Sequence, residues 1–85
     1  MKVKVLYFAS LREQLGMAFE EVNVPGDATT VGELRAHLQS RGGSYERAFA
    51  AKTAVRAAVN QDMVPPSAPI KAGDEVAFFP PVTGG

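Results

Sequence analysis

The chain holds few side chains that could do chemistry on their own. It contains no cysteine, which excludes disulfides, thiolate metal sites and cysteine nucleophiles. Its single histidine, His37, excludes a multi-histidine metal site and leaves little for Ser-His catalysis, so we predict no metal site. The acids Asp74-Glu75 have no companion acid that suggests hydrolase chemistry, and Glu20-Glu21 read as a solvated pair. Function is therefore expected at a surface or at a chain end.

The last six residues combine a stiff base with a tip that has no side chains. Pro80-Pro81 cannot extend a β-sheet ladder and favours polyproline II, and it is followed by Val82, Thr83, Gly84 and Gly85. Residues 80–85 can project up to ~20 Å, and a glycine tip can enter a tunnel that a Cβ atom would block. The reactive group of such a tail is the α-carboxylate of Gly85, which attack on the α-phosphate of ATP would activate. The alternative is an inert, frayed end or an expression remnant.

Length and charge point to one small domain without a general affinity for nucleic acid or acidic membranes. Of the 85 residues, 46% are hydrophobic, and nine basic residues balance nine acidic ones, so the chain lacks a nucleic-acid binder's charge. No apolar run approaches the ~20 residues of a membrane span, and the N-terminus lacks the pattern of a signal peptide. We predict a cytoplasmic protein with one domain over residues 1–79 and a tail over residues 80–85.

Hydrophobic patterns predict five strands and three helices. Strands are expected over residues 2–9, 18–24, 55–59, 63–64 and 75–79, and helices over residues 11–15, 31–41 and within 44–51. Two helix starts fit the capping box, in which a hydroxyl and a carboxylate satisfy backbone N–H groups: Ser10 with Glu13, and Thr30 with Glu33. Gly16 and Gly42-Gly43 should end the first two helices. On the main helix, Arg35, Gln39 and Arg41 are expected to face water.

This order of elements favours an α+β β-grasp fold, in which a mixed sheet of four to five strands packs on one main helix. The first two strands should form an antiparallel hairpin, and the crossover through the helix should place later strands parallel to the first. The side chains expected on the helix side of the sheet are Val3, Val5, Tyr7, Val76 and Phe78.

A single helix leaves the opposite face of the sheet to solvent or to a partner. The side chains expected on this face are Leu6, Phe8, Ala77 and Phe79. With Met63 and Val82, the neighbouring Phe8 and Phe79 would form an apolar patch that marks a partner interface. Arg12 at its rim could contact a partner's carboxylate or backbone. Alternatively, the short helix or the loop after residue 64 covers the patch, and Arg12 is a solvated residue.

Segments along the whole chain resemble one family. Residues 73–85, which read Gly-Asp-Glu-Val-Ala-Phe-Phe-Pro-Pro-Val-Thr-Gly-Gly, look like the C-terminal signature of the small, sulfur-carrier subunit of molybdopterin synthase. Residues 5–9 and 11–13 are similar to that family's first strand and helix, and residues 57–61 resemble its third-strand turn. The stretch 42–54 is less diagnostic.

The resemblance implies a ubiquitin-like β-grasp fold and a non-catalytic role as a carrier of sulfur. An ATP-dependent enzyme would adenylate the Gly85 carboxylate, and a sulfur-donor protein would convert it into a thiocarboxylate. The tail that carries the thiocarboxylate would enter the large catalytic subunit of a heterotetramer. There the sulfur would attack cyclic pyranopterin monophosphate, and two deliveries would build the molybdopterin dithiolene. No cofactor is expected on this chain, because the activating enzyme uses the ATP and the large subunit holds the catalytic residues.

Three other functions are also compatible with the sequence. A similar Gly-Gly β-grasp chain carries sulfur for thiazole formation, although the context Phe78-Phe79-Pro80-Pro81-Val82-Thr83 favours the molybdopterin pathway. The same activation chemistry would serve a ubiquitin-like modifier that is joined to lysines through Gly85. The chain could also be a plain interaction module with an inert tail.

Overall fold

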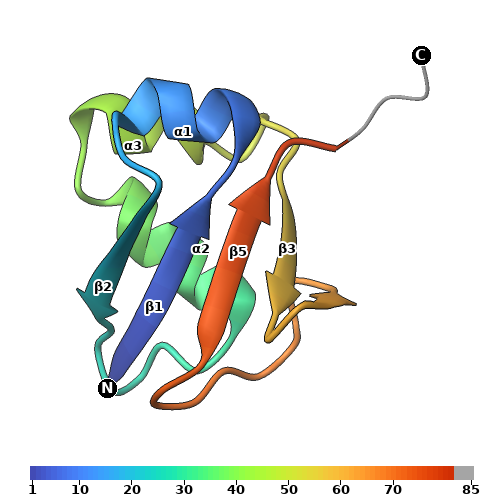
Figure 1. The fold of residues 1–85 in the computed structure, drawn as a ribbon. Coiled ribbons are helices and arrows are strands. Elements are labelled where there is room, and N and C mark those ends of the chain that lie inside the picture. Colours follow the sequence, from blue (N-terminus) through green and yellow to red (C-terminus); the bar gives the residue numbers. More distant parts are fainter. Residues whose placement is uncertain (82–85) are drawn as a thin grey trace.

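The computed structural model describes residues 1–81, which form one five-stranded sheet and three helices (Figure 1). The strands are β1 (Lys2–Tyr7), β2 (Phe19–Asn23), β3 (Arg56–Val59), β4 (Asp62–Val64) and β5 (Glu75–Phe79). The helices are α1 (Ala9–Leu15), α2 (Val31–Gln39) and α3 (Gly43–Ala48). The predicted α+β β-grasp fold is confirmed.

The strand order is β2-β1-β5-β3-β4. β1 pairs antiparallel with β2 and parallel with β5, as the hairpin and the crossover predicted. β3 runs antiparallel to β5, so the expectation that later strands run parallel to β1 is confirmed for β5 and wrong for β3. The reason is that α2 and α3 together carry the chain to the far end of the sheet, where β3 begins and runs back (Figure 1).

The core lies between the sheet and α2, which crosses behind the strands in Figure 1. All five side chains predicted for this side are at most 1% exposed: Val3, Val5, Tyr7, Val76 and Phe78. Phe49, directly after α3, is fully buried, and its ring centre lies 5.2 Å from that of Phe78 in an edge-on arrangement. Among residues 1–81, none of the helices has both the length and the apolar character that a membrane crossing requires.

α1 begins one residue before the predicted cap. Phe8 is the N-cap, and its carbonyl accepts from the N–H groups of Leu11 and Arg12, so Ser10 lies inside the first turn. The capping box predicted for Ser10 is therefore wrong, and no side chain caps this helix. Gly16 ends α1 in the left-handed conformation, with φ at 72°, as predicted.

α2 begins at the predicted capping box. Thr30 Oγ1 accepts from the Glu33 backbone N–H at 3.2 Å, and the Glu33 carboxylate accepts from the Thr29 N–H at 2.8 Å. The bonds from Thr29 and Thr30 lower the pKa of the Glu33 carboxyl. The helix ends at Gln39, two residues before the predicted end, and Gly42 and Gly43 take positive φ in the turn into α3.

Arg35 does not face water as predicted. Its Nε donates to the Phe49 carbonyl at 3.1 Å, and its Nη2 donates to the carbonyls of Ala50 and Thr53, both at 2.7 Å. The guanidinium thereby ties the loop after α3 to α2. No local pattern could reveal this, because the acceptors lie 14 to 18 residues away along the chain.

Candidate functional site

The predicted tail leaves the middle of the sheet. β5 lies between β1 and β3 and ends at Phe79, and the half-buried Pro80 and Pro81 follow outside the strand. In Figure 1, β5 finishes at the end of the sheet that α1 covers. The remaining residues of the predicted tail, Val82, Thr83, Gly84 and Gly85, lie outside the described residues.

An apolar row crosses all five strands on the sheet face opposite α2, which we call the open face. The register aligns one residue from each strand, in the order Phe19, Leu6, Ala77, Ala58 and Met63. The ends of the row are the most exposed, with Phe19 at 59% and Met63 at 58%. A continuous apolar row with exposed ends is typical of an interaction surface.

Phe8 and Phe79 extend this surface to the base of the tail. The Phe8 N–H donates to the Phe78 carbonyl at 3.1 Å, so the alignment of β1 with β5 continues past Tyr7 and sets Phe8 opposite Phe79. Phe8 is 46% exposed and Phe79 is half-buried. The structure thus brings the two rings to the same end of the open face, as predicted, and their contact with a partner stays a prediction.

The other two predicted interface residues lie at opposite margins of this surface. Met63 ends the row on the edge strand β4. Arg12 is exposed on α1 and lines a separate shallow hollow with Glu13 and Met17. The structure does not bring Arg12 to Met63, so a partner would have to span the upper end of the sheet to touch both.

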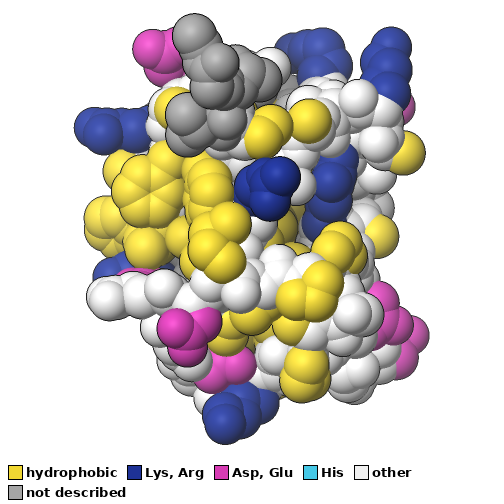
Figure 2. Space-filling view, turned by 90° about the vertical axis from the view of Figure 1, so that its right-hand side faces the viewer, with side chains coloured by type: hydrophobic (Ala, Val, Ile, Leu, Met, Phe, Trp, Pro, Cys, Tyr) yellow, Lys and Arg dark blue, Asp and Glu magenta, His cyan; other side chains and the backbone are white. Residues whose placement is uncertain are grey.

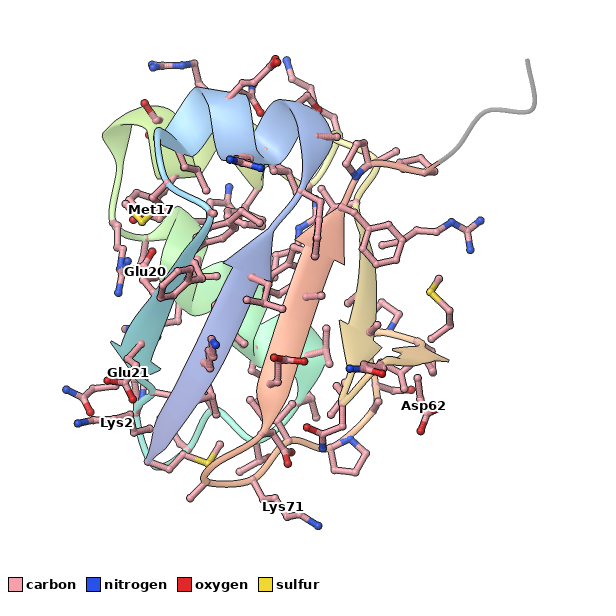
Figure 3. The ribbon with its side chains drawn as sticks, viewed as in Figure 1. Lys2, Met17, Glu20, Glu21, Asp62 and Lys71 are labelled. Carbon is pink, nitrogen blue, oxygen red and sulfur yellow. The ribbon has the colours of Figure 1, made fainter. Side chains whose placement is uncertain are left out.

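The open face has an apolar half and a charged half. Away from the end of β5, the register places Lys4 between Glu21 of β2 and Glu75 of β5. Figure 3 shows Lys2 and Glu21 at that lower end. Seen from the β3–β4 edge in Figure 2, hydrophobic side chains gather at the upper left and most acidic ones lie lower. A partner that covers the apolar half therefore lies beside the base of the tail.

Phe19 is the member of this surface that the sequence reasoning missed. It lies opposite Leu6, and the Lys4 ammonium nitrogen lies 5.0 Å from the centre of its ring. A cation at this distance is attracted by the face of an aromatic ring. The available signal was the register of the predicted hairpin, which pairs an aromatic residue with the apolar end of the first strand.

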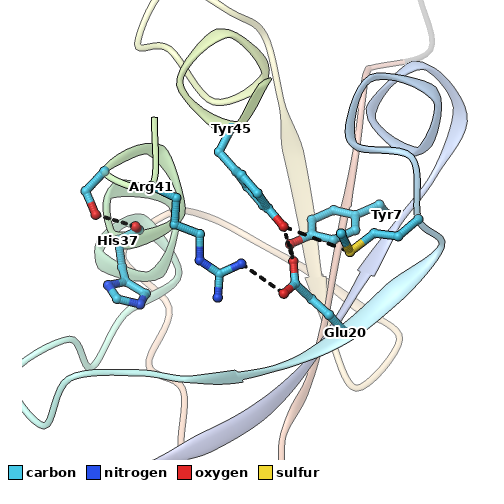
Figure 4. A network of polar contacts seen from close by, with 7 residues as sticks. Tyr7, Glu20, His37, Arg41 and Tyr45 are labelled. Carbon is cyan, nitrogen blue, oxygen red and sulfur yellow. Dashed lines mark hydrogen bonds and ion pairs between the residues drawn. The ribbon is translucent and has the colours of Figure 1, made fainter. Parts of the chain in front are cut away.

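A polar cluster closes the opposite side of the β1–β2 pair (Figure 4). The Glu20 carboxylate accepts from the hydroxyls of Tyr7 and Tyr45, both at 2.7 Å, and from Arg41 at 2.9 Å. Glu20 was expected on a solvated face, which is wrong, because it shares the side of Val5 in the ladder. His37 lies nearby on α2, where its backbone carbonyl accepts from Ser40.

The cluster shifts the proton affinities of its members in opposite directions. Burial alone would raise the pKa of Glu20, but the bonds from Arg41, Tyr45 and Tyr7 outweigh it and lower the pKa. Burial and the Glu20 carboxylate raise the pKa of Tyr7 and of Tyr45. The cluster therefore keeps one carboxylate ionised and two phenols neutral. Their hydrogen bonds connect β1, β2 and α3. Within residues 1–81, no three His, Asp or Glu side chains gather as metal ligands.

Comparison with known proteins identifies the family. A family profile described as the ThiS family matches residues 5–85. The chain belongs to the ThiS family. It is 43% identical to the molybdopterin synthase sulfur carrier subunit of Escherichia coli and 39% identical to that of Haemophilus influenzae. Each alignment covers 98% of this chain and 99% of the relative.

Solved structures of two other proteins share the whole fold. SAMP1 from Haloferax volcanii superposes with a TM-score of 0.78 at 28% identity, over 100% of both chains. A chain from the complex of subunits 1 and 2 of molybdopterin-converting factor from Helicobacter pylori gives a TM-score of 0.66 at 26% identity, also over 100% of both chains.

Proposed function

We propose that this chain is the sulfur-carrier subunit of molybdopterin synthase. The observation that carries the proposal is its similarity to two relatives of that name, at 39% and 43% identity over nearly the full length of each. The geometry adds that Pro80 leaves the central strand beside the apolar half of the open face. A partner bound to that half would lie next to the base of the tail.

In the proposed reaction, the Gly85 carboxylate is the group that changes. Its oxygen attacks the α-phosphate of ATP on an activating enzyme, which releases pyrophosphate and leaves an acyl-adenylate. Hydrosulfide supplied by a donor protein attacks the acyl carbon and displaces AMP, which leaves a thiocarboxylate on Gly85. The thiocarboxylate sulfur then bonds to cyclic pyranopterin monophosphate, and water cleaves the resulting acyl–sulfur bond and restores the Gly85 carboxylate. Two such deliveries build the dithiolene of molybdopterin. A covalent carrier supplies sulfur at a high local concentration.

The folded part serves as the surface that partners hold. The large subunit of a heterotetramer supplies the catalytic groups, and Phe8, Arg12, Met63 and Phe79 contact it. The structure from Helicobacter pylori, a complex of two subunits of a molybdopterin-converting factor, supports such a partner. Because activation consumes ATP, we place the cycle in the cytoplasm.

A second candidate function is protein modification. It is supported by the likeness to SAMP1, described as a small archaeal modifier protein, at 28% identity. In that case the acyl-adenylate would end in an isopeptide bond between Gly85 and a lysine. The curated relatives at higher identity carry the sulfur-carrier name, which favours the first function.

Intact-mass spectrometry tests the proposal. After incubation of the full chain with the activating enzyme, ATP and a sulfur source, the mass should rise by the difference between sulfur and oxygen. The product, mixed with the large subunit and cyclic pyranopterin monophosphate, should yield molybdopterin. No mass gain with an activating enzyme that is active on another carrier would contradict the proposal, and lysine conjugates without molybdopterin would favour modification.

The matched control is the chain without Gly84 and Gly85. It should show neither mass gain nor product, while its thermal unfolding stays that of the full chain, because the core of the described chain is built from residues between Val3 and Phe78. Molybdopterin formation by this variant would show that the terminal carboxylate is not the carrier group.

A further inference from the structure

A pocket opens between the N-terminal half of α2 and the β3–β4 hairpin, on the edge that faces the viewer in Figure 2. It encloses about 240 Å³. Its walls are largely apolar, with Val31 of α2, Val55 before β3, Met63 of β4 and Pro66, and the core ring of Phe78 also lines it. The volume suits one compact apolar group rather than an extended chain.

Two arginines line the same pocket, and neither has a counterion in the described part of the chain. Arg35 comes from α2, whereas Arg56 comes from β3, where it lies opposite Phe79, so its side chain leaves the strand on the open-face side of the pocket. Within residues 1–81, the one ion pair joins Arg41 to Glu20, which belongs to the polar cluster elsewhere. In Figure 2, Lys and Arg side chains stand among hydrophobic ones near the middle of this edge, away from the acidic side chains. Unpaired cations beside an apolar wall favour an anion with an apolar group.

Arg35 is prepared for such an anion. Its Nε and Nη2 are held by three backbone carbonyls, which fix the plane of the guanidinium. Its Nη1 donates to no acceptor within residues 1–81, yet no buried side-chain nitrogen there lacks a partner, so Nη1 reaches solvent. Burial lowers the pKa of this half-buried arginine. A guanidinium held in place loses little side-chain entropy when it binds a carboxylate.

The rim of the pocket disfavours a peptide strand as occupant. β4 is only three residues long and is followed by Pro65 and Pro66, which have no N–H for a ladder. The Pro66 carbonyl already accepts from the Gly32 N–H at 2.8 Å. A small molecule that fills the pocket without backbone pairing therefore fits better.

We propose that this pocket binds a small monocarboxylate with one compact aromatic or branched aliphatic group, the carboxylate lying between Arg35 and Arg56. The site is independent of the sulfur-carrier chemistry. It borders the open face through Met63, so an occupied pocket would change the surface that a partner meets.

Two-dimensional NMR of the 15N-labelled full chain tests the proposal, with 3-phenylpropionate as the probe in buffer at physiological salt. Saturable shifts in the millimolar range should appear at the amides of Val31, Arg35, Val55 and Arg56. The uncharged isostere 3-phenylpropionamide should bind about three- to fivefold more weakly, the factor expected for an ion pair near the surface. Acetate, which has the charge alone, should not saturate. Equal affinity for the acid and the amide, or shifts elsewhere, would overturn the proposal.

Variants separate the pocket from general charge effects. Arg56→Gln should weaken phenylpropionate binding by about three- to fivefold, whereas Arg47→Gln on α3, outside the pocket, should not change it. Val55→Phe should fill the cavity and abolish saturation in a chain whose spectrum is otherwise preserved. Unchanged binding in both pocket variants would overturn the proposal.

Removal of Gly84 and Gly85 provides the last control. It should abolish sulfur loading yet leave phenylpropionate affinity unchanged, so the two proposals can fail separately. Tighter binding after the deletion would overturn this one, because it would identify the chain's own terminal carboxylate as the occupant.

Discussion

The two faces of the sheet can be compared through two pairs of adjacent, identical residues, Phe78-Phe79 and Glu20-Glu21. Phe78 is 1% exposed in the core, whereas Phe79 is half-buried on the open face. Glu20 binds two tyrosines and an arginine on the α2 side, whereas Glu21 is exposed opposite Lys4. Because successive side chains on a strand point to opposite faces, the same residue type is buried at one position and accessible at the next. One face stabilises the fold, and the other is left free for recognition.

The substitution expected to have the largest effect on stability is Phe78→Ala. It removes a fully packed ring from the core and should lower the free energy of unfolding by about 3–5 kcal/mol. Urea denaturation followed by circular dichroism measures the loss, with Phe79→Ala as the matched control on the neighbouring residue. A loss for Phe79→Ala as large as that for Phe78→Ala would contradict the division between the faces.

Phe79→Asp should affect partner binding rather than stability. It places a charge in the proposed apolar contact and should weaken binding to the large subunit by about 100-fold, the loss typical of a hot-spot residue. Isothermal titration calorimetry measures the affinity, and the urea midpoint should change little. An affinity equal to that of the unaltered chain would remove Phe79 from the interface.

Glu20→Gln tests the polar cluster and should destabilise the fold by about 1–2 kcal/mol at pH 7, because a charge-assisted acceptor is lost. The pKa of Glu20 is lower in the folded chain than its value of about 4.3 in the unfolded chain. Its ionised form therefore stabilises the fold at pH values above the unfolded pKa, and this stabilisation is lost as pH falls through the folded pKa. The gap between the two proteins should therefore shrink in acid. Glu21→Gln is the control, and an equal loss in that variant would show that the cluster contributes nothing special.

The smallest expected effect is a gain from Gln61→Gly. Asn60 and Gln61 join β3 to β4 with φ at 50° and 72°, a conformation in which Asn-Gly is preferred at the two positions. Glycine at the second should raise the free energy of unfolding by about 0.5–1 kcal/mol. Both faces should be unaffected, so partner affinity should not change; a lower urea midpoint would show that Gln61 has another role.

The sequence was sufficient for features that alternation or local spacing determines. It predicted which side chains of β1 and β5 face α2, the cap at Thr30 and the end of β5 at Phe79. It failed where distant backbone groups decide the outcome. Arg35 and Glu20 were assigned to water, because their partners come from the loop after α3, from β1 and from residues beyond α2. The direction of β3 depended on how far α2 and α3 carry the chain, which no local pattern encodes.

The position of β5 also has a mechanical consequence. Its backbone is hydrogen-bonded on both sides, to β1 in parallel and to β3 in antiparallel orientation. A force that draws the chain end along the axis of β5 acts in shear, so both ladders must yield together rather than one bond at a time. The sheet should therefore resist unfolding when a bound partner exerts a pulling force on Pro80 and Pro81.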